Sequence, residues 1–210
     1  MKIGFIGGGK MAEAIIAGII DCKMVANANI FVSDISEERR KLLANKFKVN
    51  VFADNVSVCS ESDVVILAVK PQTFDAVLTE INSSVSSSHL VISIAAGKKL
   101  GTIKMHLTEA RLVRVMPNMA VTVGEGMCVY CMDKNTQGGD RKIVENIFSS
   151  MGRVVELPEK YFDVVTALSG SGPAFLAYVL SSMVDAAKAE GLPDDYALLL
   201  AEQTMLGCAR

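Results

Sequence analysis

The chain has 210 residues, half of them hydrophobic, and a formal net charge of −2 at pH 7. This length suits one large domain, or an ordinary domain with a smaller partner. The slight negative charge argues against a nucleic-acid or anionic-membrane partner and favours small-molecule chemistry. Unbroken apolar runs such as 64–69 are much shorter than the roughly 18 to 20 residues of a membrane span, and no signal-peptide pattern follows Met1. We therefore expect a cytoplasmic protein without a membrane segment.

Short β-branched runs alternate with amphipathic stretches in the first half of the chain. The predicted strands are 3–6, 30–33, 64–69 and 90–94, and the predicted helices are 11–20, 37–47 and 74–81. The run from Val64 to Val69 is apolar throughout, as expected for a strand covered by helices on both faces of its sheet. The alternation predicts an α/β fold with a doubly wound, mostly parallel sheet.

The second half of the chain changes from strands to helices. Strands at 112–116, 127–130 and 154–157 and a helix at 140–150 extend the sheet to its far edge, so that a first unit closes near residue 158. Beyond it we predict a helix at 162–168, a turn at 169–173, a long helix at 174–190 and a last helix from residue 194. Pro173 and Gly191 fit the usual start and stop signals of the long helix. Its broad apolar stripe requires cover from a second chain.

The last helix reaches Arg210 without a capping residue, so we expect the natural protein to continue further. The odd number of cysteines, five, indicates free thiols. Cys128 and Cys131 form a C-x-x-C inside a predicted strand, where positions three apart point to opposite faces. Buried structural thiols are therefore favoured over a metal site or redox pair. Neither His89 nor His106 has a carboxylate at ligand spacing, so we predict no metal site and no catalytic side chain, and any chemistry comes from a cofactor.

Residues 7–12, Gly-Gly-Gly-Lys-Met-Ala, match the G-x-G-x-x-[GA] pattern between a predicted strand and a predicted helix. Gly7 permits a tight turn, Gly9 lets the backbone approach a diphosphate, and Ala12 lets the helix pack closely on the strand. The alternative is a tight glycine turn without a ligand. The position at the first strand-to-helix turn favours dinucleotide binding. The predicted diphosphate-binding residues are Gly7, Gly8, Gly9, Lys10, Met11 and Ala12.

The stretch after the second predicted strand gives conflicting signals on the cofactor. Asp34 stands where an acidic residue would bind the ribose hydroxyls of NAD, whereas Ser33, Ser36, Arg39 and Arg40 could serve a 2′-phosphate. A carboxylate beside a phosphate costs Coulomb energy, so the pattern leans to NADH while NADPH stays open. In a third interpretation Asp34 only caps the next helix, as Ser36 could.

Further stretches share one pattern: the Gly-rich turn, 68–71 (Ala-Val-Lys-Pro), 93–97 with 114–118 (Arg-Val-Met-Pro-Asn), and 167–174 (Ala-Leu-Ser-Gly-Ser-Gly-Pro-Ala). Together they resemble the pyrroline-5-carboxylate reductase family over nearly the whole chain. The resemblance implies a Rossmann-type domain at 1–158 and an all-helical dimerisation domain, here incomplete, at 159–210. It also implies a homodimer or higher homo-oligomer and reduction of (S)-1-pyrroline-5-carboxylate to L-proline by NADPH or NADH.

Matched positions then imply site residues. The adenosine end of the cofactor is expected at Ser33, Asp34 and Asn55, and its nicotinamide half at Ala68, Val69, Lys70, Pro71, Ala95 and Ala96. The substrate, a cyclic imino acid, is expected at Asn118, Ser169, Gly170, Ser171 and Gly172. Loop N–H groups and hydroxyls before Pro173 suit a carboxylate, although a structural kink between domains is the alternative. Hydride transfer to an iminium needs orientation and an anion site rather than a strong base, so the absence of a catalytic histidine is no objection.

The sequence departs from the family in two places. Some members carry serine or another non-acidic residue at the position of Asp34, and the family's glycine- and threonine-rich substrate loop has no match before Arg210. Two other functions stay open. A 3-hydroxyacid-type dehydrogenase of the same two-domain plan would use a lysine on the long helix, but Lys188 lies near the C-terminal end of that helix. A non-enzymatic NAD(P)-sensing dimer would bind the cofactor without turnover.

Overall fold

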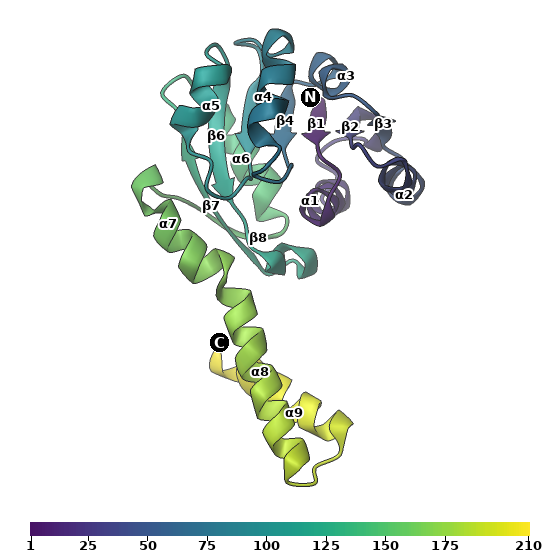
Figure 1. Cartoon of the computed structure of the whole chain (residues 1–210), viewed down its shortest axis with the longest axis vertical. Helices are drawn as coiled ribbons and strands as arrows, with labels where there is room; N and C mark the ends of the chain where they lie inside the picture. The colour runs from purple at the N-terminus through teal and green to yellow at the C-terminus, as the bar shows by residue number, and fades with distance from the viewer.

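A sheet with helices on both faces forms the body of the molecule, and a helical arm extends from it (Figure 1). The computed structural model describes residues 1–210. Its strands are β1 (Ile3–Ile6), β2 (Ile30–Ser33), β3 (Asn50–Phe52), β4 (Val64–Leu67), β5 (Leu90–Ser93), β6 (Arg111–Met116), β7 (Gly126–Met132) and β8 (Gly152–Glu156). They lie in the order β3-β2-β1-β4-β5-β6-β7-β8, and every neighbouring pair is parallel except β6 with β7. The prediction of a doubly wound, mostly parallel sheet of Rossmann type is confirmed.

Helices connect the strands and then continue alone. The body contains α1 (Lys10–Asp21), α2 (Glu37–Phe47), α3 (Asn55–Glu61), α4 (Phe74–Ile81), α5 (Leu100–His106) and α6 (Asp140–Ser149). A short helix, α7 (Phe162–Val165), leads into the arm, which consists of α8 (Gly172–Ala189) and α9 (Asp194–Cys208). The sequence pattern predicts α2 and α4 with these same bounds, and it places the other elements that it finds within a few residues.

Three short elements lie outside the sequence prediction. β3 has three residues, and α3 and α5 have seven each, which is too short for a clear periodic pattern. The sequence of α3, Asn-Val-Ser-Val-Cys-Ser-Glu, is also poor in strong helix formers. The capping residue of α3, Asp54, could have predicted its start, because the Asp54 carboxylate accepts a hydrogen bond from the Ser57 N–H at 2.7 Å.

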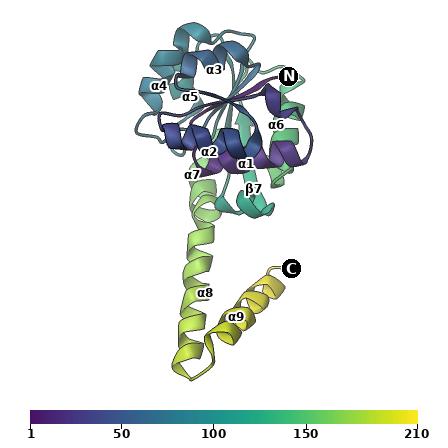
Figure 2. The same cartoon turned by 90° about the vertical axis from the view of Figure 1, so that its right-hand side faces the viewer.

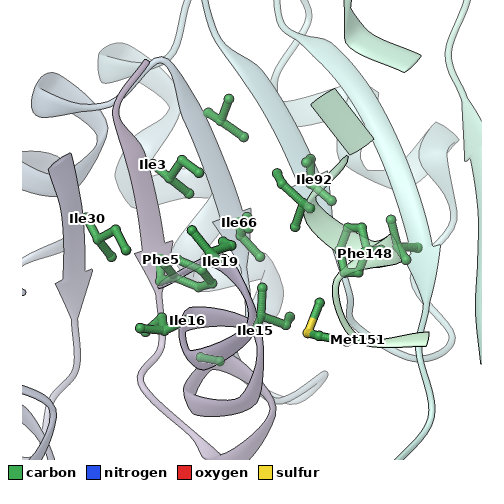
Figure 3. Packing of buried hydrophobic residues seen from close by; sticks show 14 of the residues in the cluster. Ile3, Phe5, Ile15, Ile16, Ile19, Ile30, Ile66, Ile92, Phe148 and Met151 are labelled. Carbon is green, nitrogen blue, oxygen red and sulfur yellow. The ribbon is translucent and has the colours of Figure 1, made fainter. Parts of the chain in front are cut away.

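The core lies on both faces of the sheet, as the apolar strands predict. In β4, Val64 and Ile66 belong to a cluster of 24 buried residues beneath α1 and α6. Val65 and Leu67 point the other way, into a cluster of 16 buried residues beneath α3, α4 and α5. Figure 3 shows side chains of α1 and α6 meeting those of the strands in the larger cluster. Helices on both faces therefore hold the strand ends in fixed positions.

The predicted turn at 169–173 is wrong. The backbone stays helical from α7 through a π-helical turn, η5 (Thr166–Gly170), into α8, which begins at Gly172. The Ser171 N–H donates to the Thr166 carbonyl at 2.8 Å, so it is not one of the free N–H groups that a helix start would offer. The Ser-Gly composition that suggests a turn is accommodated here as one widened helical turn.

The arm exposes its apolar side chains. No residue of α8 is buried, and Phe175 and Tyr178 are 64% and 76% exposed. Figure 2 shows α8 leading away from the body and α9 returning beside it as a hairpin. By length and composition alone, Glu159–Ala189 could cross a membrane, since its mean hydropathy is 1.4 over an 18-residue window. The expectation from unbroken apolar runs does not include this stretch, because scattered polar residues interrupt it; a single apolar helix of this kind is weak evidence for a membrane.

The cysteine pair of β7 lies as predicted. Cys128 faces the larger core cluster, and Cys131 faces the opposite side, where it packs with Phe162 of α7. Burial raises the pKa of both thiols to about 12. All five cysteines are free. The prediction of buried structural thiols on opposite faces is confirmed for this pair.

We expect Phe148→Ala to lower the free energy of unfolding by about 3 to 5 kcal/mol, because the ring is fully buried in the larger cluster and its removal leaves a cavity. Urea titration at one fixed protein concentration measures this loss. Met105→Ala is the control: its side chain is 74% exposed on α5, and we expect a change below about 0.5 kcal/mol. Equal losses for both variants would contradict the placement of α6 against the core.

Candidate active site

The ends of four adjacent parallel strands form one edge of the sheet. Ile6, Ser33, Leu67 and Ser93, the last residues of β1, β2, β4 and β5, are register partners in one row. The Gly-rich turn, Asp34 and the predicted nicotinamide-binding residues follow these ends directly. Strand order reverses between β1 and β4, and in open parallel sheets ligands bind in the crevice at such a switch point. The structure therefore brings the predicted cofactor residues to one edge.

The Gly-rich turn has a closed side and an open side. Gly7 has a φ of +94°, its N–H donates to the Ser33 carbonyl at 2.9 Å, and an added Cβ would lie 2.8 Å from the Ala68 carbonyl oxygen. Gly9, at the start of α1, is exposed, and an added Cβ would meet no atom within 4 Å. The N-terminus of α1 thus faces free space beside the switch point, where its N–H groups and dipole suit an anion.

Asp34 fixes the Gly-rich turn. Its carboxylate accepts from the Gly8 N–H and from the Ser36 N–H, each at 2.8 Å. The side chain that caps α2 is Ser36, whose hydroxyl oxygen accepts from the Arg39 N–H at 3.2 Å. The interpretation of Asp34 as only a helix cap is therefore wrong. Because both carboxylate oxygens hold main-chain N–H groups, this end of the site presents a fixed hydrogen-bond acceptor.

An ion cluster behind the turn was not predicted. The Arg39 guanidinium donates to the carbonyls of Gly8 and Gly9 and pairs with the Glu13 carboxylate of α1. The Lys46 ammonium lies 2.8 Å from the same carboxylate. Hydrogen bonds from Lys46 and Arg39 lower the pKa of Glu13 to about 2. Arg39 is thus bonded to the Gly-rich turn and to Glu13. Glu13, an acidic residue in the first turn of α1, was the sequence feature that could have pointed to this cluster.

Polar side chains form a chain of hydrogen bonds at the predicted adenosine end. Ser33 is 1% exposed, and its hydroxyl donates to Asn55 Oδ1 at 2.7 Å. The Asn55 amide nitrogen donates to the Glu80 carboxylate of α4, also at 2.7 Å. Asn55 is therefore the side-chain partner of the buried Ser33 hydroxyl. Sequence reasoning missed Glu80, because nothing in the local pattern links α4 to Asn55.

The predicted substrate residues lie beyond the end of β6. Asn118 Oδ1 accepts from the Met127 N–H at 3.1 Å, which ties β6 to β7. The Ser169 hydroxyl is buried without a hydrogen-bond partner. An added Cβ on Gly170 would lie 2.7 Å from Met116 Cε, so the π-helical turn packs closely on the end of β6. The structure thus places Gly170 against Met116, two residues before Asn118. Single π-helical turns often occur at functional sites.

A cavity lies elsewhere, away from the Gly-rich turn. It has a volume of about 520 Å³ and is lined between α5 and the ends of β7 and β8 by residues that include Leu100, Cys131 and Glu159. Next to it, the buried Arg114 guanidinium pairs with Glu159 at 3.0 Å, and the Leu100 N–H donates to the same carboxylate oxygen at 2.7 Å. Arg114 also lies over the Phe162 ring, 4.6 Å from its centroid. These contacts join the body to the first residues of the arm, and they include none of the predicted cofactor residues.

Comparison with known proteins assigns the chain to a family. It is 47% identical over all its 210 residues to a pyrroline-5-carboxylate reductase of Methanosarcina acetivorans, and the match covers 78% of that enzyme. The chain belongs to the pyrroline-5-carboxylate reductase family. Two family models match parts of it: "NADP oxidoreductase coenzyme F420-dependent" at residues 2–97 and "Pyrroline-5-carboxylate reductase dimerisation" at residues 159–210.

Solved structures of pyrroline-5-carboxylate reductases have the same fold. The enzyme of Coxiella burnetii is 33% identical with a TM-score of 0.92, and the match covers all of this chain and 78% of that one. The enzyme of Plasmodium falciparum, solved with NADP bound, is 34% identical with a TM-score of 0.90, over 99% of this chain and 76% of that one. The family assignment confirms the resemblance seen in the sequence and makes the chain an NAD(P)-dependent oxidoreductase. The roles of individual site residues stay predictions.

We expect Gly9→Val to abolish binding of NADH and NADPH while the fold stays intact. The new side chain meets no protein atom but occupies the space in which the predicted diphosphate would lie. Calorimetric titration measures binding, and circular dichroism measures folding. Gly138→Val, at another glycine with free space around it, is the matched control and should bind normally. Undiminished affinity in Gly9→Val would remove the diphosphate from this turn.

The ion cluster gives a pH prediction. The folded-state pKa of Glu13, about 2, lies below its ordinary 4.5, so the ionised carboxylate stabilises the fold above about pH 4.5 and this contribution is lost as the pH falls toward about 2. We expect Glu13→Gln to unfold at lower urea than the unsubstituted chain at neutral pH, and the difference to shrink through that window. Glu37→Gln, at an exposed carboxylate of α2, should show no such trend. A difference that stays constant with pH would contradict the assignment.

Proposed function

We propose that the chain catalyses the reduction of (S)-1-pyrroline-5-carboxylate to L-proline with NADPH or NADH. The observation that carries the proposal is the match over the whole chain to enzymes named for this substrate, at 47% identity in the archaeal relative. The geometry supports it independently, because an open helix N-terminus lies at the switch point of a Rossmann-type sheet.

The cofactor supplies a hydride when it is bound. The residues of this chain are suited to hold the cofactor in place. Gly7, Gly8 and Gly9 with 10–12 would hold the diphosphate, and 68–71 with 95–96 would flank the nicotinamide. The hydride adds to the carbon of the protonated C=N bond, the bond's π electrons move to nitrogen, and the proton already on nitrogen stays there. The protein therefore has to orient two partners and neutralise the substrate carboxylate, without a strong base.

The substrate carboxylate belongs, in this proposal, near Asn118 and 169–172. The Ser169 hydroxyl supports this placement, because a buried donor without a partner is uncommon unless a ligand or water satisfies it. Because the backbone is helical here, the Ser171 N–H is already bonded to a main-chain carbonyl. The hydrogen-bond donors that this segment offers to the substrate carboxylate are therefore the hydroxyls of Ser169 and Ser171. The proposal keeps these residues as positioning groups for the imine.

We further propose the division into 1–158 and 159–210 and a homodimer or larger homo-oligomer that forms through the second part. The dimerisation family model spans 159–210, and the apolar side chains of α8 are exposed in the single chain. A second copy would cover them, which accounts for an apolar helix without a membrane. Free thiols fit a reducing compartment, so a cytoplasmic location belongs to the same proposal.

A substrate panel tests the activity. We expect the chain, incubated with NADH or NADPH, to oxidise the cofactor when pyrroline-5-carboxylate is added, and to leave 3-hydroxy acids unchanged with the oxidised cofactors. Proline appearing in equal amount to the oxidised cofactor would support the reductase. Turnover of hydroxy acids alone would refute it, and tight cofactor binding without turnover of any substrate would favour an NAD(P)-sensing dimer.

The structure weakens the hydroxyacid alternative. Lys188 lies near the end of α8, and its ammonium is 2.9 Å from the Asp194 carboxylate. This hydrogen bond raises the pKa of Lys188, so the amine stays protonated and is less available to accept a proton. The lysine that such a mechanism would need is therefore paired close to the last residue of α8. Figure 1 shows that this end of α8 points away from the sheet.

A further inference from the structure

The hydrogen-bond chain at the adenosine end ends in a carboxylate. Asn55 Oδ1 accepts from Ser33 and the Asn55 amide nitrogen donates to Glu80, so the amide orientation is fixed from both sides. An ionised carboxylate accepts hydrogen bonds only, which leaves the amide nitrogen no other orientation toward Glu80. Glu80 therefore determines which atoms Asn55 offers to a ligand.

The same residue adds negative charge. Asp34, on the other side of this end of the site, is also a carboxylate, and neither Asp34 nor Glu80 forms an ion pair. Among the nearby cations, Arg39 is paired with Glu13, and Arg40 donates to the main-chain carbonyl of Asp34 at 2.6 Å. Lys46 shares Glu13 with Arg39, and neither cation reaches Asp34 or Glu80. The two carboxylates at the adenosine end therefore have no cation partner of their own, and they hold fixed hydrogen-bond acceptors in place.

We propose that Glu80 is a specificity-determining residue, which selects NADH over NADPH by orienting Asn55 and by repelling a 2′-phosphate. Ribose hydroxyls are donors and satisfy acceptors such as the Asp34 carboxylate, whereas a phosphate is an acceptor and carries added negative charge. The Debye length is about 8 Å at physiological salt. A phosphate bound against Asn55 lies well within this distance of Glu80, so salt does not screen out the repulsion between them. This inference rests on the proposed function, because it assumes that the cofactor lies at this edge.

Fluorescence titration with NADH and NADPH tests the selection without turnover. We expect the unsubstituted chain to bind NADH more tightly, and Glu80→Gln to reduce the NADPH-to-NADH ratio of Kd values about three- to tenfold, because glutamine keeps an acceptor for Asn55 but removes the charge. Glu61→Gln is the matched control. Glu61 lies at the C-terminal end of α3, the helix that begins with Asn55, and pairs with Lys2, so removal of its charge should leave the ratio unchanged.

Two further measurements separate charge from orientation. Glu80→Ala removes both the charge and the acceptor, so it should weaken NADH binding as well, which Glu80→Gln should not. In the unsubstituted chain, 2′,5′-ADP should compete more effectively against NADH as salt rises, because screening reduces the repulsion.

An unchanged ratio in Glu80→Gln, or tighter binding of NADPH than of NADH by the unsubstituted chain, would overturn the inference. Failure of the unsubstituted chain to bind either cofactor would instead refute the proposed function.

Discussion

The close approach of the Gly-rich turn to β4 is the contact on which the site depends. Gly7 lies so near the Ala68 carbonyl that no side chain fits between them, and its N–H is bonded to the end of β2. Because the turn touches both neighbours of β1, it spans the switch point and directs α1 away from the sheet edge. The Asp34 carboxylate accepts from the Gly8 N–H of the turn, and the Arg39 guanidinium donates to its Gly9 carbonyl. An open N-terminus at Gly9 follows from these constraints rather than from any feature of α1 alone.

A second constraint joins the body to the arm. Arg114 of β6 is 2% exposed, and a buried guanidinium is tolerated only when its charge and donors are satisfied. Glu159, which precedes α7, supplies the charge, and Phe162 covers the guanidinium face. The same carboxylate oxygen holds the start of α5 through the Leu100 N–H. One residue pair therefore sets where the helical segment leaves the sheet, and with it the place of the π-helical turn beside Asn118.

Most of the sheet could be predicted from the sequence because its strands are buried on both faces and read as unbroken apolar runs. The Gly-rich turn was predictable as well, because a tight turn with close backbone contacts requires glycine, and glycine is visible in the sequence. The segment at 169–173 misled the prediction because serine and glycine suit a turn and a widened helix equally, and packing against Met116 decides between them. Glu80 was not predictable as a site residue, nor was the pairing of Arg39 with Glu13, because these partners lie on different helices and come together only when the sheet forms.

The arm has little buried surface within the single chain. With no buried residue in α8 and two buried alanines in α9, the hairpin has no core of its own, so its helices gain their stability only from whatever packs on them. In the proposed homo-oligomer, the order of this segment depends on protein concentration by mass action, while the sheet keeps its own core at any dilution. The amide protons of the arm should therefore exchange with solvent faster on dilution, and those of β1 and β4 should not.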